Sequence, residues 1–233
     1  MECLYLPETD LTTRTIVPNE SERKHIKALR LKQDEKIMIT NGRGYCFIAC
    51  VNYDKSYNPT LEVEMALENY GEEDCSIDIL ICNIADKNRL EWAVEKSTEL
   101  GVSQIFLKNC YYSQIKKIDL NRLTNKAISA IKQCKRSKLP KINILESKDF
   151  LPEEFVAKYQ KIVVLDENGR TPIEEQIASP ILLVVGPEGG LHSKELLDLN
   201  NISKIVKWKI GKRRLRTETA IVAAISIALG IMK

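Results

Sequence analysis

The sequence has few residues of the kinds that build metal centres. Its 233 residues include only two histidines, His25 and His192, and none of its seven cysteines lies in a Cys-x-x-Cys pair. Zinc sites are built from cysteine and histidine ligands at short spacings, so we expect no metal site. An odd number of scattered cysteines also argues against a disulfide framework, and we expect reduced thiols in a cytoplasmic protein.

Long apolar runs are missing as well. Pro7 to Asp10 interrupts the N-terminal region with polar residues, so we expect no signal peptide. The longest apolar stretch, Ala220 to Met232, is shorter than a membrane span and contains Ser226 and Gly230. We therefore expect no membrane partner. Apolar residues encircle this stretch, which indicates a buried or subunit-interface helix and predicts a homodimer.

Two common nucleotide-binding patterns are also absent. The chain contains neither the phosphate-binding Gly-x-x-x-x-Gly-Lys-Ser/Thr loop nor the dinucleotide-binding Gly-x-Gly-x-x-Gly loop. Pockets of those two kinds are excluded. The composition that remains, 44% hydrophobic and 29% charged, is typical of a soluble globular protein with one large or two small domains.

Basic residues are concentrated in two segments although the net charge is only +3. Residues 116–141 hold nine lysines and arginines, Lys116 among them, against the single acid Asp119, and residues 204–216 hold seven basic residues and no acid. This distribution favours a polyanionic partner such as RNA. A solvated helix face is the alternative interpretation of the first segment.

The pattern of apolar residues divides the chain in two. Residues 1–70 read mostly as strands, with an Asn-Gly hairpin turn at Asn41-Gly42. The polar stretch 69–74 reads as a linker. Residues 75–233 alternate short apolar runs with amphipathic segments, which predicts an α/β domain. One predicted helix, residues 119–136, carries Arg122, Lys126, Gln133 and Arg136 on its polar side.

Two glycine- and charge-marked turns dominate the C-terminal part. Gly186-Pro187-Glu188-Gly189-Gly190 follows the apolar run 181–185, and residues 211–220 follow the run 205–210. Each turn leads into a helix, with Ser193 as the expected cap of the first and Thr217 of the second. Such strand–turn–helix units place a ligand pocket at the carboxyl ends of strands.

These two motifs, in this order, resemble the signatures of the RsmE family of the SPOUT superfamily, whose members methylate N3 of a uridine in 16S ribosomal RNA. Residues 95–102, with Glu95-Lys96-Ser97-Thr98-Glu99-Leu100-Gly101-Val102, and residues 132–140 resemble further family motifs. The resemblance implies an α/β fold with a trefoil-knotted parallel sheet, helices on both of its faces, and a small N-terminal PUA-like β-barrel. It also implies an RNA-binding domain at 1–70, a methyltransferase domain at 75–233 and a homodimer.

The resemblance further implies that S-adenosylmethionine is the cofactor and that the small ribosomal subunit is the partner. The implied donor-site residues are Leu165, Gly186, Pro187, Glu188, Gly189, Gly190, Ile210, Gly211, Arg213, Leu215, Thr217, Glu218 and Thr219. The residues expected to contact RNA are Arg23, Lys24, His25, Arg30, Lys87, Arg89, Arg122, Lys126, Gln133 and Arg136.

Methylation of uridine N3 requires loss of its proton, and negative charge then builds on the uracil oxygens. A guanidinium can stabilise that charge, so Arg216 is the first catalytic candidate, with Glu188 as a base or ligand orienter. Another target base, or a non-catalytic RNA-binding assembly factor, remains an alternative. The chain departs from the family pattern at three positions: Tyr112 stands where the family frequently has arginine, Lys132 where it has glutamate, and Arg214 where it prefers an aliphatic residue.

Overall fold

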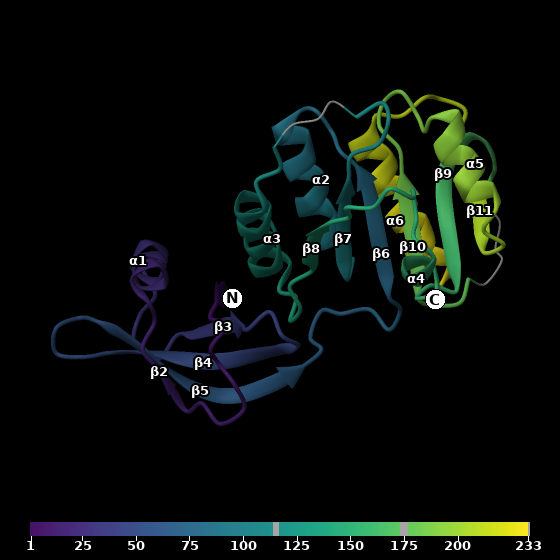
Figure 1. Ribbon diagram of the computed structural model, residues 1–233. Coiled ribbons are helices and arrows are strands. Elements are labelled where there is room, and N and C mark those ends of the chain that lie inside the picture. Colours follow the sequence, from purple (N-terminus) through teal and green to yellow (C-terminus); the bar gives the residue numbers. More distant parts are fainter. Residues whose placement is uncertain (114–116, 173–176, 233) are drawn as a thin grey trace. The chain divides into compact units, whose positions relative to one another are not determined.

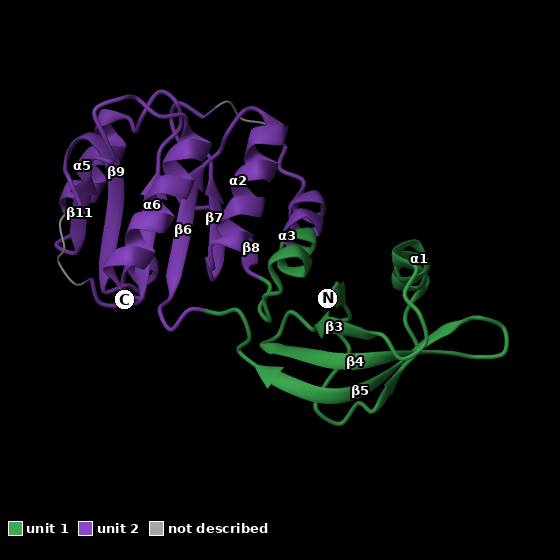
Figure 2. Cartoon of the chain, turned by 180° about the vertical axis from the view of Figure 1, so that it is seen from behind, with its two compact units in different colours: residues 1–72, 128–139 green, residues 73–127, 140–233 purple. Residues whose placement is uncertain are grey.

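The computed structural model describes residues 1–113, 117–172 and 177–232, and Lys116 lies outside this part of the chain (Figure 1). The chain divides into two compact units, coloured separately in Figure 2. Unit 1 comprises Met1–Glu72 and Ile128–Leu139, and unit 2 comprises Glu73–Ala127 and Pro140–Lys233. The break after Glu72 falls inside the predicted linker, and residues 128–139 are grouped with the first unit.

Unit 1 is a five-stranded sheet with one helix. Its elements are β1 (Cys3–Tyr5), β2 (Thr15–Ile16), α1 (Glu20–Leu29), β3 (Lys36–Thr40), β4 (Tyr45–Tyr53) and β5 (Pro59–Glu68), in the sheet order β1-β3-β4-β5-β2. The predicted hairpin turn joins β3 to the antiparallel β4. There the Asn41 side chain accepts hydrogen bonds from the N–H groups of Arg43 and Tyr45, and Gly42 has φ of 68°. Apolar side chains from the strands and from Ile26 of α1 form the core.

The segment 128–139 is fastened to unit 1 by Arg136. The guanidinium is 3% exposed and donates to the Glu72 carboxylate at 2.7 Å, while the Arg136 carbonyl accepts from the Thr40 hydroxyl. Helix α3 (Leu120–Cys134) ends before this residue, because Lys135 adopts a left-handed conformation with φ of 62°. Two sequence predictions are therefore wrong: Arg136 does not lie on the helix, and its buried, paired guanidinium is not available to RNA.

Unit 2 is built on a six-stranded, entirely parallel sheet in the order β11-β9-β10-β6-β7-β8. Its strands are β6 (Ile77–Cys82), β7 (Gln104–Lys108), β8 (Lys141–Ile144), β9 (Lys161–Arg170), β10 (Ile181–Val185) and β11 (Ile205–Trp208). Its helices are α2 (Lys87–Glu99), the first part of α3, α4 (Glu153–Val156), α5 (Ser193–Asn200) and α6 (Thr217–Ile231). The predicted α/β fold with a parallel sheet is confirmed.

Helices cover both faces of this sheet. One set of alternating strand residues, which includes Leu80 and Val184, packs with Phe155 of α4 and Leu199 of α5. The intervening residues face the other side, because successive side chains of a strand point to opposite faces. On that side α6 contacts β10 and α2. Since both faces are covered, the strands are nearly continuous apolar runs, and β10 is buried at every position.

Several local predictions need correction. His192, not Ser193, is the N-cap of α5, and Arg216, not Thr217, is the N-cap of α6. The elements β2, β8 and α4 were not predicted. Cys82 and Cys110 form a disulfide with a Cα–Cα distance of 5.7 Å, so the expectation of reduced thiols is wrong for this pair. The strand register explains this proximity. Cys82 of β6 is the pairing partner of Lys108 of β7, and Cys110 follows Lys108 by two residues.

Candidate functional site

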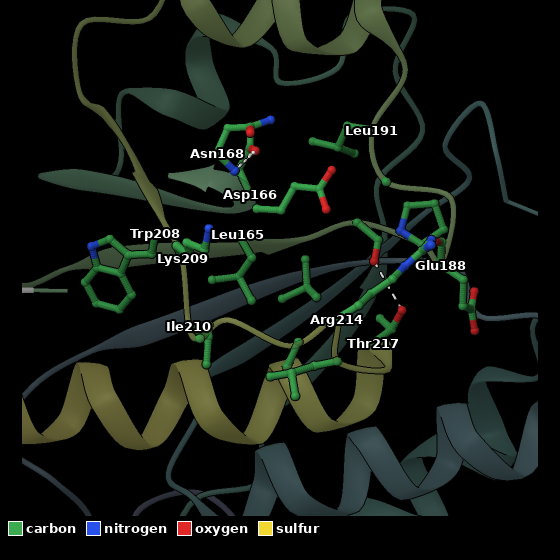
Figure 3. A pocket seen from close by; sticks show the side chains of 18 of the residues that line it. Leu165, Asp166, Asn168, Glu188, Leu191, Trp208, Lys209, Ile210, Arg214 and Thr217 are labelled. Atoms are coloured by element: carbon green, nitrogen blue, oxygen red, sulfur yellow. Dashed lines mark hydrogen bonds between the residues drawn. The ribbon is translucent and has the colours of Figure 1, made fainter. Parts of the chain in front are cut away.

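A pocket of about 760 Å³ opens at the carboxyl ends of the neighbouring strands β9, β10 and β11 (Figure 3). The residues that line it are Leu165, Asp166, Glu167, Asn168, Val185, Gly186, Pro187, Glu188, Gly189, Gly190, Leu191, Leu196, Trp208, Lys209, Ile210, Gly211, Lys212, Arg213, Arg214, Leu215, Thr217 and Ala220. The volume is that of a small-molecule site. Crevices outside the carboxyl ends of parallel strands are the usual ligand sites of α/β sheets.

The loop at residues 186–190 forms one wall as a tight turn. The Gly190 N–H donates to the Pro187 carbonyl at 2.8 Å, and Gly190 has φ of 76°, a conformation that side-chain-bearing residues rarely adopt. A Cβ atom on Gly189 would lie 3.1 Å from the Cβ of Tyr112, so this position also admits little more than glycine. Both glycines leave backbone groups exposed to a ligand.

The segment at residues 209–216 forms the opposite wall and is joined to the first loop. The Thr217 hydroxyl donates to the Gly186 carbonyl at 3.3 Å, and the Arg214 guanidinium donates to the Glu188 carbonyl (Figure 3). Thr217 was expected to cap α6. It is instead the first residue of that helix, and its side chain bridges the two glycine-marked segments. These bonds hold the two walls of the pocket together.

The third wall comes from β9. Asp166 accepts a hydrogen bond from the Asn168 N–H at 2.8 Å, and its carboxylate lies 3.6 Å from the Lys207 ammonium. At Gly169 a Cβ atom would lie 2.7 Å from the backbone of Lys207, so only glycine lets β9 and β11 approach this closely. The pocket therefore combines carboxylate and backbone acceptors with an apolar floor that includes Leu165, Val185 and Leu196.

Arg89, near the start of α2, ties two of these segments to each other. Its Nη1 donates to Glu188 Oε1 at 2.6 Å, and its Nη2 donates to Glu218 Oε2 at 2.5 Å. Glu188 belongs to the first pocket loop and Glu218 to the first turn of α6. We call these three residues the Arg89 clamp. The sequence reading assigned Arg89 to RNA, whereas here its guanidinium already binds two carboxylates of unit 2.

The hydrogen bonds of the clamp shift the pKa values of Glu218 and Arg89. Hydrogen bonding to Arg89 lowers the pKa of Glu218, against the opposing effect of burial. Two carboxylate hydrogen bonds likewise raise the pKa of Arg89. Both shifts favour the charged forms of Glu218 and Arg89. Glu218 also lies in the first turn of α6, where the helix dipole favours a negative side chain.

Most of the donor-site residues named from the sequence lie around the pocket. Only Glu218 and Thr219 are absent from its lining: Glu218 belongs to the clamp, and Thr219 is exposed. The list named from the sequence lacks the other lining residues, which are Asp166, Glu167, Asn168, Val185, Leu191, Leu196, Trp208, Lys209, Lys212, Arg214 and Ala220. Their signal in the sequence was their position beside Leu165 or near the two motifs. Arg216 is exposed at the N-cap of α6.

The basic residues proposed for RNA are divided between the units. In unit 2, Lys87 and Arg122 line a second, smaller groove at the end of β6, and Arg122 and Lys126 both face the buried Glu91. Gln133, near the end of α3, is exposed.

In unit 1, Lys24 and Arg30 are exposed on and beside α1, and Arg23 donates to the Pro18 carbonyl. His25 shares Glu22 with Lys132, whose ammonium lies 2.9 Å from that buried carboxylate. This ion pair accounts for a lysine at a position where the resembled family has glutamate.

The described residues contain neither a cluster of metal ligands nor a helix that could span a membrane. Within residues 1–113, 117–172 and 177–232, no group of three or more His, Cys, Asp or Glu side chains is arranged to hold a metal ion. In the same part of the chain, no helix combines the length and the hydropathy that crossing a membrane requires.

Comparison with known proteins connects this geometry to one group. Residues 72–229 match the model of the RNA methyltransferase domain. The chain is 28% identical to the ribosomal RNA small subunit methyltransferase E of Buchnera aphidicola, over 94% of this chain and 88% of the relative. It is 26% identical to the enzyme of that name from Bacillus subtilis, over 90% and 87% of the two chains. The crystal structure of the Neisseria gonorrhoeae methyltransferase E bound to S-adenosyl methionine superposes with a TM-score of 0.83 at 26% identity, over 97% of this chain and 95% of that one.

Proposed function

The chain belongs to the RsmE family of RNA methyltransferases, and we propose that it transfers a methyl group from S-adenosylmethionine to N3 of a uridine in 16S ribosomal RNA. The observation that carries this proposal is the pocket at the ends of β9, β10 and β11, because both glycine-marked motifs line it and the Thr217–Gly186 hydrogen bond joins them.

The residues of the pocket fit S-adenosylmethionine. Leu165, Leu196 and Ile210 offer an apolar surface for the adenine ring, and Asp166 offers acceptors for ribose hydroxyls. The basic side chains of Lys209, Lys212 and Arg213 suit the carboxylate of the methionine part. When bound, this cofactor supplies a methyl group on a positively charged sulfur.

The chain's own contribution is mainly positioning and charge stabilisation. Arg216 is exposed directly before α6, beside the pocket lining, and its guanidinium is our candidate for stabilising negative charge on a uracil oxygen. Glu188 is held at the pocket by Arg89 through one carboxylate oxygen. We assign it the role of orienting ligand or substrate.

RNA binding is proposed to use both units. In unit 2, Lys87, Lys117 and Arg122 line the second groove at the carboxyl edge of the same sheet. In unit 1, the sheet and the exposed Lys24 and Arg30 support a PUA-like RNA-binding barrel for residues 1–70. Tyr112 stands where the family frequently has arginine, so in this chain the other basic residues are left to neutralise the RNA backbone.

The assembly is proposed to be a cytoplasmic homodimer with a trefoil knot. Following β11, the chain returns past the ends of β9 and β10 and places α6 against β10 and α2. This course supports a C-terminal segment threaded behind the 186–190 loop. On α6, Val222, Ile227 and Ile231 remain half-buried, as residues of an intersubunit face would be.

The proposal is tested by incubating the purified protein with methyl-labelled donor and small ribosomal subunits, followed by nucleoside analysis of the RNA. N3-methyluridine is the expected product. Label on another nucleoside would assign a different target base. Binding of donor and RNA with no transfer to either free RNA or subunits would favour the assembly-factor alternative.

A further inference from the structure

Two exposed tyrosines lie beside the donor pocket, at a place where the resembled family carries an arginine. Tyr111 is 68% exposed and Tyr112 is 49% exposed, and both follow the disulfide-bonded Cys110 at the end of β7. The Tyr111 ring stacks on the His192 ring with centroids 4.0 Å apart and an angle of 29°. Tyr112 meets Tyr111 edge-on, with centroids 5.1 Å apart. We call these three side chains the aromatic cluster.

The cluster adjoins the pocket directly. A Cβ atom on Gly189 would lie 3.1 Å from Tyr112, so Tyr112 packs against the loop that forms one wall of the donor site. His192 is the cap of α5, the helix that this same loop enters. A group that rests on the rings is therefore next to the rim of the pocket.

The backbone that carries Tyr111 and His192 is held in place by one carboxylate. Glu195 accepts hydrogen bonds from the Tyr111 N–H at 2.9 Å and from the His192 N–H at 2.7 Å. The His192 ring is fixed further, because its Nδ1 accepts from the Lys194 N–H at 3.2 Å. None of these bonds uses the Tyr111 hydroxyl. The arrangement thus presents exposed aromatic rings on an anchored backbone, and these rings are available for stacking with a planar group.

We propose that the aromatic cluster stacks an unpaired nucleobase of the RNA substrate, next to the nucleotide that enters the donor pocket. Sequence-specific proteins splay the bases of single-stranded RNA onto tyrosine, phenylalanine and histidine rings, and any base offers the required π-face. Stacking gives this chain a contact that phosphate-binding cations do not provide. The inference rests on the proposed RNA methyltransferase function, and its test needs no methyl transfer.

The test compares a labelled oligoadenylate with an abasic ribose-phosphate oligomer of the same length, by fluorescence anisotropy on the full chain. The two carry the same charge, so the difference in affinity isolates the bases. Wild type is expected to bind oligoadenylate more tightly. Tyr111→Ala is expected to reduce that difference on the order of ten- to a hundredfold, as loss of one stacked base does. Tyr111→Phe is expected to retain it, because the ring is kept.

Leu197→Ala is the matched control, since Leu197 is an exposed apolar residue of the neighbouring α5 and bears no ring. It is expected to leave both affinities unchanged. If Tyr111→Ala melts below the assay temperature, Tyr111→Leu replaces it, because leucine covers His192 without a π-face.

The proposal is overturned if wild type does not distinguish the two oligomers, or if folded Tyr111→Ala keeps the full difference. It is also overturned if Tyr111→Phe is as weak as Tyr111→Ala. A change from dimer to monomer in sedimentation of Tyr111→Ala would make the cluster a subunit contact instead. Failure of the proposed methylation is distinguishable, because it would leave the preference for oligoadenylate in place.

Discussion

Removing the guanidinium of the Arg89 clamp is expected to loosen the donor pocket as well as to destabilise unit 2. In Arg89→Ala, the carboxylates of Glu188 and Glu218 both lose the guanidinium that links the 186–190 loop and the start of α6 to α2. The two ion pairs contribute unequally to the free energy of unfolding. The side chain of Glu188 is 47% exposed, so its pair with Arg89 contributes only about 0–1 kcal/mol to the free energy of unfolding.

The second pair is stronger because Glu218 is 13% exposed and its hydrogen bond is charge-assisted. Such bonds contribute about 1.5–3 kcal/mol. The penalty of a fully buried, unpaired charge does not apply, since some solvent reaches Glu218 and the α6 dipole stabilises its charge. We therefore expect the free energy of unfolding to fall by about 2–3 kcal/mol, and the affinity for S-adenosylmethionine to fall roughly tenfold because the 186–190 loop loses one of its anchors.

Urea unfolding and calorimetric titration with S-adenosylmethionine measure the two effects. Arg122→Ala is the matched control, because Arg122 also pairs with a buried carboxylate, Glu91, yet does not line the donor pocket. It is expected to lower stability and leave donor affinity unchanged. A double-mutant cycle with Glu218→Gln should give a larger coupling to Arg89 than a cycle with Glu188→Gln.

The pH dependence follows from the lowered pKa of Glu218. A carboxylate with a depressed folded-state pKa contributes stability that is complete above its ordinary value of 4.5 and is lost as pH falls through the lowered pKa. The stability difference between wild type and Glu218→Gln should therefore vanish in acid. If Arg89→Ala keeps wild-type stability and donor affinity but binds RNA more weakly, the clamp has no positioning role and Arg89 acts on the RNA, as the sequence suggested.

Three further substitutions test other parts of the structure. Arg216→Ala should lower the single-turnover rate on the order of 10²–10³-fold with little change in donor affinity, and an unchanged rate at saturating RNA removes Arg216 from the catalytic role. Gly169→Ala should lower the free energy of unfolding by about 1–3 kcal/mol, because the added methyl meets the Lys207 backbone, and an unchanged urea midpoint would show that β9 and β11 can separate freely. Lys132→Glu should lower the melting temperature, because it places a second carboxylate beside the buried Glu22, and an unaltered thermal melt would argue against that ion pair.

The elements that the sequence predicted well are those with a strong local signal. The run 181–185 is strand β10 at the same bounds, because a strand buried on both faces is continuously apolar. Gly101, a residue type that commonly ends helices in the left-handed conformation, has φ of 87° after α2. Asn19, a residue type favoured at helix N-caps, caps α1 with its side chain accepting from the Glu22 N–H. In each case a few neighbouring residues determine the outcome.

The elements that were missed lack such a signal. Strand β8 has four residues that are mostly exposed, and α4 is a single turn. The end of α3 was placed two residues late, since nothing in Lys135 itself indicates a left-handed conformation. The second half of β9, residues 166–170, is polar, and its sequence is typical of a loop.

For the site, the two motifs indicated which segments form the pocket, but not the contacts that hold it. In the Arg89 clamp, Arg89 binds Glu188, which is 99 positions away in the sequence, and Glu218, which is 129 positions away. No local pattern encodes such a pairing. The same holds for Arg136, which pairs with Glu72 at a distance of 64 residues in sequence. Residues were assigned to RNA from the family resemblance and from their charge, whereas their availability depends on the tertiary structure.

The most direct test of the whole account is mass spectrometry of nucleosides from small-subunit ribosomal RNA, taken from cells with and without this protein. The account predicts that N3-methyluridine is present at one position in normal cells, is lost when the gene is deleted, and returns with the wild-type chain but not with Arg216→Ala. An unchanged N3-methyluridine content in the deletion strain, or loss of a different methylated nucleoside, would contradict it.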